Sequence, residues 1–362
     1  MSTTETDALQ QPVSEDDLQR FVQQVVADLA AASSGVMVTL GHRLGLYRIL
    51  AELGPTDSAT IAQASGCHER YVREWLNSQV AAGYASYDAA ARRYSMRPEQ
   101  AMVLADPDSP VFLPMAFEVP AAMWNDREKA VDAFRSGRGV PWGDHHPCLF
   151  SGTAAFFRNG YAANLVSSWL PALDGVVAKL ERGARVADVG CGYGHSTLLM
   201  AEAYPQSQFI GFDNHGPSVE AARANARDAG VGERVRFEQQ AAKAVSGGPY
   251  DLVCFFDCLH DMGDPAGAAR HVRELLAPDG AVMLVEPLAG NAVEENVGPV
   301  GSLYYSASVM LCCAHSLSEE VGTALGAQAG EARLAEIFRE AGYSRFRRAT
   351  ETPFNLILEA RP

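Results

Sequence analysis

The C-terminal half of the chain alternates strand-like and helix-like stretches, and this alternation restricts the fold more than any other feature. The apolar runs ARVADVG, QFIGFDNH, RVRFEQQ, YDLVCFFD and AVMLVEP are separated by helical segments such as HSTLLMAEAYP and PAGAARHVRELLAPDG. Strands that alternate with helices of about 10–15 residues are typical of βαβ units with parallel strands. Residues 176–362 are therefore predicted to form an α/β domain around a parallel sheet.

The end of the chain departs from this rule. After the helical stretch EARLAEIFREAGY, the strand-like runs RFRRAT and FNLILEA are separated only by a tight turn at Thr352 and Pro353. Parallel strands need a long crossover connection, so these two strands must be antiparallel. The sheet is predicted to be mostly parallel, with an antiparallel C-terminal hairpin.

The first hundred residues have a different pattern. Residues 17–52 show apolar side chains at helical spacing, a short helix starts near Thr60, and a longer helix runs from about Glu69 to Ala82. A hairpin is expected at Asp88 to Arg92. Helix, turn, helix and hairpin in this order are typical of a winged-helix domain.

These patterns predict four parts. Residues 1–16 are expected to be a disordered tail and residues 17–97 a winged-helix-like domain that mediates dimerisation. Residues 98–175, which are rich in aromatic residues and proline, are expected to form a helical linker that helps to wall a substrate pocket. Residues 176–362 are the predicted catalytic domain.

Charge and composition exclude several classes of protein. The formal net charge is -15 and the isoelectric point is about 5.0, whereas nucleic-acid binding depends on neutralising phosphates with Lys and Arg. Nucleic acid is therefore not expected as a partner. The 7 cysteines form no zinc-type C-x-x-C pairs. With neither a signal peptide nor a long uninterrupted apolar run, the sequence predicts a cytoplasmic protein with no membrane partner.

A glycine-rich loop follows the first strand of the predicted sheet. In VADVGCGYGHST, Gly190, Gly192 and Gly194 alternate behind Asp188, so the backbone can approach a nucleotide-like ligand without a Cβ atom in the way. The dinucleotide fingerprint G-x-G-x-x-G would need glycine at 195, where this chain has histidine. Asp213 ends the second strand, where a carboxylate accepts hydrogen bonds from both ribose hydroxyls.

The D-x-G-x-G-x-G loop, the acid after the second strand and the final hairpin occur together, and in this combination the chain resembles class I (Rossmann-like) S-adenosylmethionine-dependent methyltransferases. The resemblance implies a seven-stranded sheet, S-adenosylmethionine as cofactor and S-adenosylhomocysteine as its product. It also implies a set of cofactor-binding residues: Asp188, Gly190, Gly192, Gly194, Asp213, Asn214, Ala241, Ala242 and Asp257.

One position departs from the family pattern. Many members have an acid after the third strand, facing the adenine amine, but this chain reads EQQAAKA, with Ala241 at the corresponding position. In place of a contact with an acid, we expect backbone or apolar contacts to recognise the adenine in this chain.

The order of the domains resembles, more narrowly, small-molecule O-methyltransferases, which dimerise through a winged-helix-like first domain. The segment DCLHDMGDP looks like their H-D-x-x-D motif. The resemblance implies that His260 is the general base and that Glu286, at the end of the fifth strand, orients it. Displacement at a sulfonium methyl group needs alignment and, for a hydroxyl acceptor, a group that accepts the proton.

The segment WGDHHPCLF contains two adjacent histidines. His145 and His146 together with Asp144 and Cys148 allow a metal site, but adjacent side chains in extended or turn backbone point apart and no second cluster accompanies them. No metal is therefore expected. The low-specificity candidates for substrate contact are His145, His146, Trp142 and Tyr305.

Two functions of different classes remain open at this point. The first is an enzyme that methylates a small organic acceptor at oxygen, with nitrogen, sulfur and carbon as alternative targets because all use the same cofactor loop. The second is a transcription regulator that senses the cofactor and binds DNA through its winged helix. Arginines and acids are balanced over Leu40 to Gln100, which favours the enzyme.

Overall fold

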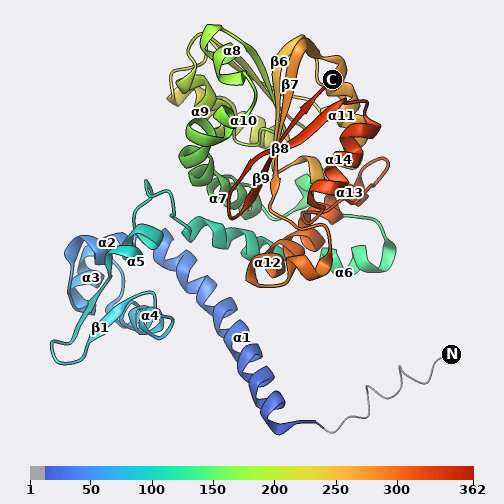
Figure 1. Ribbon diagram of the computed structural model, residues 1–362. Helices are drawn as coiled ribbons and strands as arrows, with labels where there is room; N and C mark the ends of the chain where they lie inside the picture. The colour runs from blue at the N-terminus through green and yellow to red at the C-terminus, as the bar shows by residue number, and fades with distance from the viewer. Residues whose placement is uncertain (1–12) are drawn as a thin grey trace. The chain divides into compact units, whose positions relative to one another are not determined.

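The computed structural model describes residues 13–362 and divides the chain into two compact units, one that ends at Phe117 and one that spans Glu118–Pro362 (Figure 1). The predicted division into four parts stays a prediction. Of the expected disordered tail, residues 1–12 lie outside the described residues, and the first helix already begins at Glu15.

The first unit has the elements of a winged helix. Its helices and strands are α1 (Glu15–Arg43), α2 (Leu46–Leu53), α3 (Ser58–Ser65), α4 (Glu69–Ala81), β1 (Ser86–Asp88), β2 (Arg93–Ser95), α5 (Pro98–Leu104) and the short η2 (Pro114–Phe117). The Asp57 carboxylate accepts a hydrogen bond from the Thr60 amide and so fixes the start of α3. Leu50, Ile61 and Leu76 are fully buried between α2, α3 and α4.

Helix α1 carries exposed apolar side chains over its whole length. By length and composition alone, Glu15–Arg43 would suffice to cross a membrane, although its apolar residues form no uninterrupted run. The absence of a membrane partner therefore stays a prediction.

The second unit is the α/β domain. Its α-helices before the sheet are α6 (Glu118–Ser136), α7 (Cys148–Asn164) and α8 (Val176–Arg182). Its strands are β3 (Arg185–Val189), β4 (Gln208–Asp213), β5 (Val235–Gln239), β6 (Tyr250–Phe256), β7 (Leu276–Pro287), β8 (Arg345–Glu351) and β9 (Asn355–Arg361). The helices between the strands are α9 (His195–Ala203), α10 (Gly216–Asp228), α11 (Pro265–Glu274) and α14 (Gly330–Glu340).

The strands form one 7-stranded sheet in the order β5-β4-β3-β6-β7-β9-β8. The pairs from β5 to β7 are parallel, and β9 is antiparallel to both β7 and β8. This confirms the predicted fold class, a Rossmann-like seven-stranded sheet with an antiparallel C-terminal hairpin.

Alternating side chains of the central strands build a core on each face of the sheet. Leu252 and Cys254 point to the face covered by α9 and α10, whereas Val253 and Phe255 point to the face covered by α11 and α14 (Figure 1). Because strands buried on both faces have no polar side, they appear in the sequence as continuous apolar runs.

A helical segment that the strand and helix patterns did not identify lies between β7 and α14. It consists of α12 (Pro299–Ala307), a π-helical turn (Ser308–Cys312) and α13 (Cys313–Ser318). Tyr304 in α12 donates its hydroxyl to the carbonyl oxygen of Phe354, so the segment is attached to the end of the sheet hairpin.

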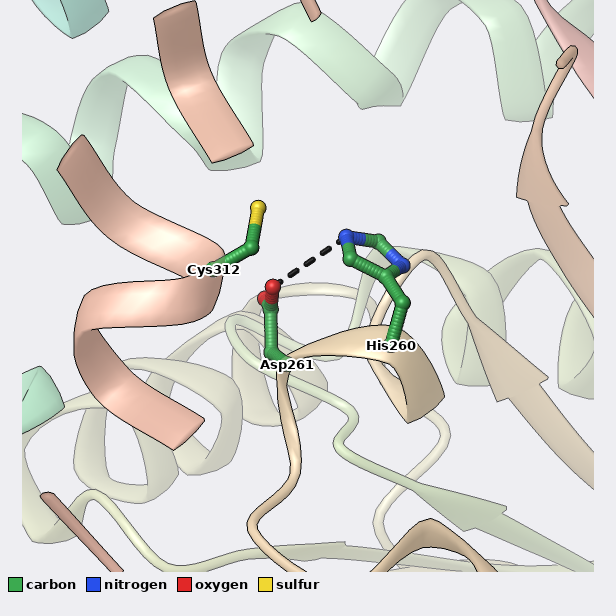
Figure 2. A group of neighbouring side chains, drawn as sticks. All are labelled: His260, Asp261 and Cys312. Atoms are coloured by element: carbon green, nitrogen blue, oxygen red, sulfur yellow. Dashed lines mark ion pairs between the residues drawn. The ribbon is translucent and has the colours of Figure 1, made fainter. Parts of the chain in front are cut away.

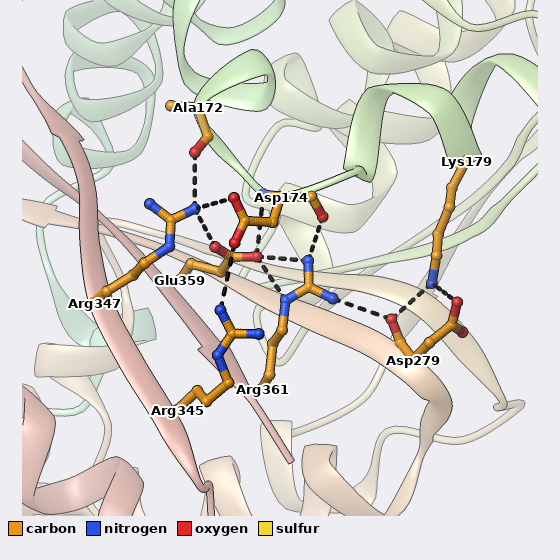
Figure 3. A network of polar contacts seen from close by, with 8 residues as sticks. All are labelled: Ala172, Asp174, Lys179, Asp279, Arg345, Arg347, Glu359 and Arg361. Atoms are coloured by element: carbon orange, nitrogen blue, oxygen red, sulfur yellow. Dashed lines mark hydrogen bonds and ion pairs between the residues drawn. The ribbon is translucent and has the colours of Figure 1, made fainter.

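A polar network attaches the final hairpin to the segment before β3. Glu359 is 2% exposed and pairs with Arg347 and Arg361, and its Oε1 also accepts a hydrogen bond from the backbone amide of Asp174 (Figure 3). Arg361 also donates to the carbonyl oxygens of Asp174 and Asp279. A buried carboxylate requires such partners because desolvation of an unpaired charge is costly.

Replacement of Glu359 by alanine is expected to lower the free energy of unfolding by about 2–3 kcal/mol, because two arginines lose a charged hydrogen-bond acceptor. Chemical denaturation measures this change. The control is Glu351→Ala on β8, an exposed residue whose partner Arg348 keeps Glu331, and its effect should stay below about 0.5 kcal/mol. Equal losses for the two variants would contradict a structural role of the buried network.

Candidate active site

A cavity of about 420 Å³ opens at the carboxyl ends of the parallel strands. Its lining comes from the segments after β3, β4, β5 and β6, from one side of α7, and from the region around His315 to Glu320. Parallel α/β sheets bind ligands at this edge, and a volume in the range of about 300–1,000 Å³ is usual for small-molecule sites.

The glycine loop between β3 and α9 forms one wall of the cavity. Gly190, Gly192 and Gly194 have φ angles of 76°, 52° and 77°. Residues with a Cβ atom rarely adopt this backbone conformation. A Cβ atom on Gly192 would meet no atom within 4 Å, whereas one on Gly194 would lie 2.5 Å from the Phe237 ring. Gly190 and Gly192 line the cavity, and Gly194 instead packs against the sheet core.

Asp188 lies behind the loop and does not line the cavity. Its Oδ2 accepts hydrogen bonds of 2.6 Å from the hydroxyls of Ser196 and Thr197, at the start of α9. Burial raises the pKa of Asp188 to about 6, although these two hydrogen bonds act in the opposite direction. The carboxylate therefore orients the turn and the first residues of α9.

Asp213, at the end of β4, reaches across to the same loop. Its Oδ2 accepts the Gly192 amide at 2.9 Å, and its Oδ1 accepts the His215 amide at 2.8 Å. Burial raises the pKa of Asp213, while these two backbone amides lower it. Asp213 and the neighbouring Asn214 line the cavity, so a ligand there meets a carboxylate whose position is fixed by the backbone.

The segment after β5 contributes Gln240, Ala241, Ala242 and Lys243 to the cavity. The ammonium of Lys243 lies 3.1 Å from Asp264 and 3.6 Å from Glu320. No carboxylate comes from this loop, as the sequence indicated.

Asp257 follows β6 and also lines the cavity. Its Oδ2 accepts the Tyr161 hydroxyl at 2.9 Å, and its Oδ1 accepts the Asn355 side-chain amide at 2.9 Å. Burial raises the pKa of Asp257 to about 8, and the charge of Glu286 adds to this effect. Tyr161 and Asn355 are functional candidates that sequence reasoning missed, because each lies more than 90 positions from Asp257 and has no motif of its own.

His260 and Glu286 form a buried pair next to the cavity. Nδ1 of His260 is hydrogen bonded to the Glu286 carboxylate, and Nε2 lies 3.1 Å from Oδ1 of Asp261. His260 is 4% exposed and does not line the cavity, whereas Asp261 does. Burial lowers the pKa of His260, but the carboxylates of Glu286 and Asp261 outweigh this effect and raise it well above the usual value.

Cys312 lies beside His260 and Asp261 (Figure 2). His260, Asp261 and Cys312 each offer an atom that could bind a metal, all within 4.8 Å of one another. Both ring nitrogens of His260 face carboxylates, and burial raises the pKa of the Cys312 thiol to about 12, so the absence of a metal here stays a prediction. A thiol that stays protonated is a poor metal ligand.

The candidate substrate residues are dispersed. Trp142 lines the cavity, but His145, His146 and Tyr305 do not. His145 is buried, with Nδ1 3.0 Å from the Asp126 carboxylate, while His146 is exposed and its Nδ1 lies 3.0 Å from the Cys148 sulfur. The two adjacent rings thus have separate partners.

Comparisons with known proteins agree with this architecture. Residues 32–106 match the family model of an Rv2258c-like winged HTH domain, and residues 180–342 match that of a methyltransferase domain. The acetylserotonin O-methyltransferase of Mus musculus molossinus is 26% identical over 336 residues, which cover 86% of this chain and 81% of that protein.

Two solved structures share the fold. A putative O-methyltransferase from Nostoc punctiforme superposes with a TM-score of 0.72 at 20% identity, covering 94% of this chain and 99% of that one. Human N-acetylserotonin methyltransferase in complex with S-adenosylmethionine gives a TM-score of 0.70 at 18% identity, covering 97% and 99%.

The fold and the glycine-loop site thus define a class I methyltransferase domain that follows a winged helix-turn-helix domain. The chain thus combines a winged helix-turn-helix domain with a methyltransferase domain, and over most of its length it is similar to an acetylserotonin O-methyltransferase.

The residues at the cavity fit S-adenosylmethionine as the cofactor. Gly192 leaves open space where any side chain would project, and Asp213 offers a fixed carboxylate beside it. A glycine turn and a carboxylate at the ends of neighbouring strands suit the methionine and ribose parts of a nucleoside.

The two glycines allow a test of the loop geometry. Gly194→Ala should lower the free energy of unfolding by about 2–4 kcal/mol, because the new Cβ atom both opposes a positive φ and collides with the Phe237 ring. Gly192→Ala is the matched control and should cost only about 1 kcal/mol, since it has the same backbone strain without the collision. Urea denaturation distinguishes the two, and losses of the same size would argue against the close packing at Gly194.

Proposed function

We propose that this enzyme transfers the methyl group of S-adenosylmethionine to a hydroxyl of a small organic acceptor, with His260 as general base. The observation that carries the proposal is the buried His260–Glu286 pair at the same sheet edge as the cavity. A histidine oriented by a carboxylate is a suitable proton acceptor for a hydroxyl.

When bound, S-adenosylmethionine supplies an electrophilic methyl group on a positively charged sulfur. We assign Gly190 and Gly192 to its methionine part, Asp213 with Asn214 to the ribose, and Ala241 with Ala242 to the adenine. Asp188 and Gly194 act through the shape of the loop, because neither lines the cavity.

His260 is oriented by two carboxylates. Glu286 accepts the Nδ1–H and so leaves Nε2 as the atom that takes the proton. Nε2 faces Asp261, which lines the cavity. In the proposed reaction the acceptor hydroxyl replaces Asp261 at Nε2 and donates its proton there as its oxygen gains the methyl group.

The walls of the cavity favour an apolar or aromatic acceptor. Aromatic side chains from η3 (Trp142–Asp144) and α7 share the lining: Trp142, Phe150, Phe157 and Tyr161. Ligand sites of this kind combine apolar walls with a few polar groups that fix orientation. Contacts of His145, His146 and Tyr305 with the acceptor stay predictions.

The arginines of the first unit support an enzyme rather than a DNA-binding regulator. Three arginines of the helix-turn-helix and its hairpin are paired with acids: Arg70 with Glu74, Arg73 with Glu69, and Arg93 with Asp57. A recognition helix whose arginines are neutralised is a weak phosphate binder.

Helix α1 supports a homodimer, whereas a cytoplasmic location stays a prediction. Leu18, Phe21, Val25 and Leu29 follow one another at three- and four-residue spacing, Val22 lies beside Phe21, and all five are exposed. A continuous apolar stripe on a helix requires a partner, and two-fold homodimers are the commonest oligomers of soluble enzymes.

His260→Ala should lower turnover by about 10²–10⁴-fold, because the hydroxyl loses its proton acceptor. Binding of S-adenosylmethionine, measured by calorimetry, should stay within about twofold of the parent protein, since His260 does not line the cavity. His68→Ala, in the first unit, is the control and should retain parental turnover. Parental turnover in His260→Ala would instead indicate that the enzyme transfers the methyl group by aligning the two substrates alone. Such a mechanism suits a nitrogen, sulfur or carbon acceptor that is already nucleophilic.

The pH dependence follows from the two carboxylates. They raise the pKa of His260, so the neutral ring that accepts a proton becomes abundant only at a higher pH than for an ordinary histidine. The acid-side limb of the turnover profile, where activity rises with pH, should therefore lie above the usual histidine pKa of about 6.5. Asp261→Asn removes one of the charges and should shift that limb to lower pH in a kcat profile. An unshifted limb would contradict the assignment of this titration to His260.

Light scattering at micromolar concentration should give a mass of two chains. Phe21→Glu places a charge in the apolar stripe and should produce monomers, whereas Ala27→Glu adds the same charge on the opposite side of α1 and should not. A monomeric parent protein would refute the dimer.

A further inference from the structure

Asp257 holds an unusual position for a carboxylate. It has a φ of 49°, lies at the end of the fully buried strand β6, and is 9% exposed. Residues other than glycine are uncommon in this region, and Asn and Asp tolerate it best. Its two oxygens are fixed by Tyr161 from α7 and Asn355 from β9. Elements distant in sequence thus hold one carboxylate at the cavity wall.

The strand order locates Asp257 between the two halves of the proposed reaction. Along the carboxyl edge the order is β4, β3, β6 and β7. These strands carry, in turn, Asp213 for the ribose, the Gly190 loop, Asp257, and Glu286 with its partner His260. In this order, the end of β6 lies between the strands assigned to the nucleoside and the strand that carries Glu286.

The surroundings of Asp257 are aromatic. Phe157, Tyr161 and Phe256 line the cavity near it, with ring centroids of Tyr161 5.6 Å from Phe157 and 5.3 Å from Phe256. Aromatic faces attract cations that have no hydrogen to donate. Aromatic walls together with a buried carboxylate therefore suit a sulfonium, which is such a cation.

The titratable groups that act on Asp257 include only one with a positive form. These groups are Glu286 from β7, His260 and Asp261 from η7 (Leu259–Asp261), Tyr161 from α7, Tyr304 from α12 and Cys258 next along the chain. Of these only His260 can be cationic, and it is already paired with two carboxylates.

We propose that Asp257 is the counter-charge by which the enzyme distinguishes the sulfonium of S-adenosylmethionine from the neutral thioether of S-adenosylhomocysteine. The inference rests on the proposed function of the cavity. Methyl transfer breaks the carbon–sulfur bond, forms the carbon–oxygen bond, leaves the electron pair on sulfur, and sends the hydroxyl proton to His260. Asp257 then loses its cationic partner, which favours release of the product.

A proton linkage supports this role. Because burial raises the pKa of Asp257 to about 8, the carboxyl is largely protonated at pH 7 without ligand. A bound sulfonium favours the charged form, so binding of S-adenosylmethionine releases a proton below pH 8, and binding of S-adenosylhomocysteine does not.

Isothermal titration calorimetry on the full chain, with both ligands, tests the proposal. At pH 8.5 Asp257→Asn should weaken S-adenosylmethionine binding about tenfold or more and S-adenosylhomocysteine binding less than about threefold, since one favourable charge pair is lost. Asparagine also tolerates the positive φ. Asp264→Asn is the matched control, because Asp264 lines the same cavity but is paired with Lys243, and it should leave the ratio of the two affinities unchanged.

A second measurement does not depend on Asp257→Asn folding. In the parent protein the ratio of the two affinities should rise up to about tenfold per pH unit below pH 8 and then level off. Tyr161→Phe keeps the ring but removes a hydrogen bond that lowers the pKa of Asp257, so the midpoint should move to higher pH.

The outcomes separate the two proposals. Equal loss of both ligands in Asp257→Asn, or a ratio that does not vary with pH, overturns the role of Asp257 and leaves the cofactor assignment intact. A parent protein that binds neither ligand overturns the cofactor assignment, and the Asp257 proposal with it.

Discussion

Parallel pairing of β3 with β4 and β6 is the constraint on which the rest of the catalytic unit depends. It brings the ends of three strands to one edge, where the amides of Gly190 and Cys191 donate to the Phe212 carbonyl at 2.7 and 3.0 Å. The turn after β3 is thereby joined to the end of β4. Asp213 completes the junction through the Gly192 amide, so the cavity wall is made of backbone fixed on both sides.

The same edge concentrates buried acids, which is costly unless each has a partner. Asp188 is held by two hydroxyls, Asp213 by two backbone amides, and Asp257 by a phenol and an amide. These partners hold the carboxylates in place although burial raises the pKa of each. Perturbed carboxylates that converge on a cavity are a mark of functional sites.

The His260 region illustrates how neighbours change the chemistry of one residue. An isolated histidine would titrate near neutral pH, but here Glu286 and Asp261 face its two nitrogens and favour the imidazolium. The ring is also separated from the cavity, which Asp261 lines and His260 and Glu286 do not. Access of an acceptor to His260 is thus coupled to the position of the Asp261 side chain.

Sequence alone determined the elements of the fold and much of the cavity. Apolar runs without helical period gave the strands, and the short Thr352–Pro353 turn required the antiparallel hairpin, because these signals are local. The segment from α12 to α13 was not anticipated, since its helices are short and interrupted by a π-helical turn. The alternating glycines identified the loop, although Gly194 packs against Phe237 rather than facing the cavity.

Only the tertiary structure decided which side chains meet. Tyr161, Asp257 and Asn355 come together from α7, β6 and β9, and no spacing in the sequence indicates that contact. The burial of His260 between two carboxylates and the orientation of Asp188 away from the cavity likewise depend on the packing of separate elements. Local patterns fix secondary structure through nearby backbone and side-chain preferences, whereas the protonation and reach of a side chain depend on residues that folding brings beside it.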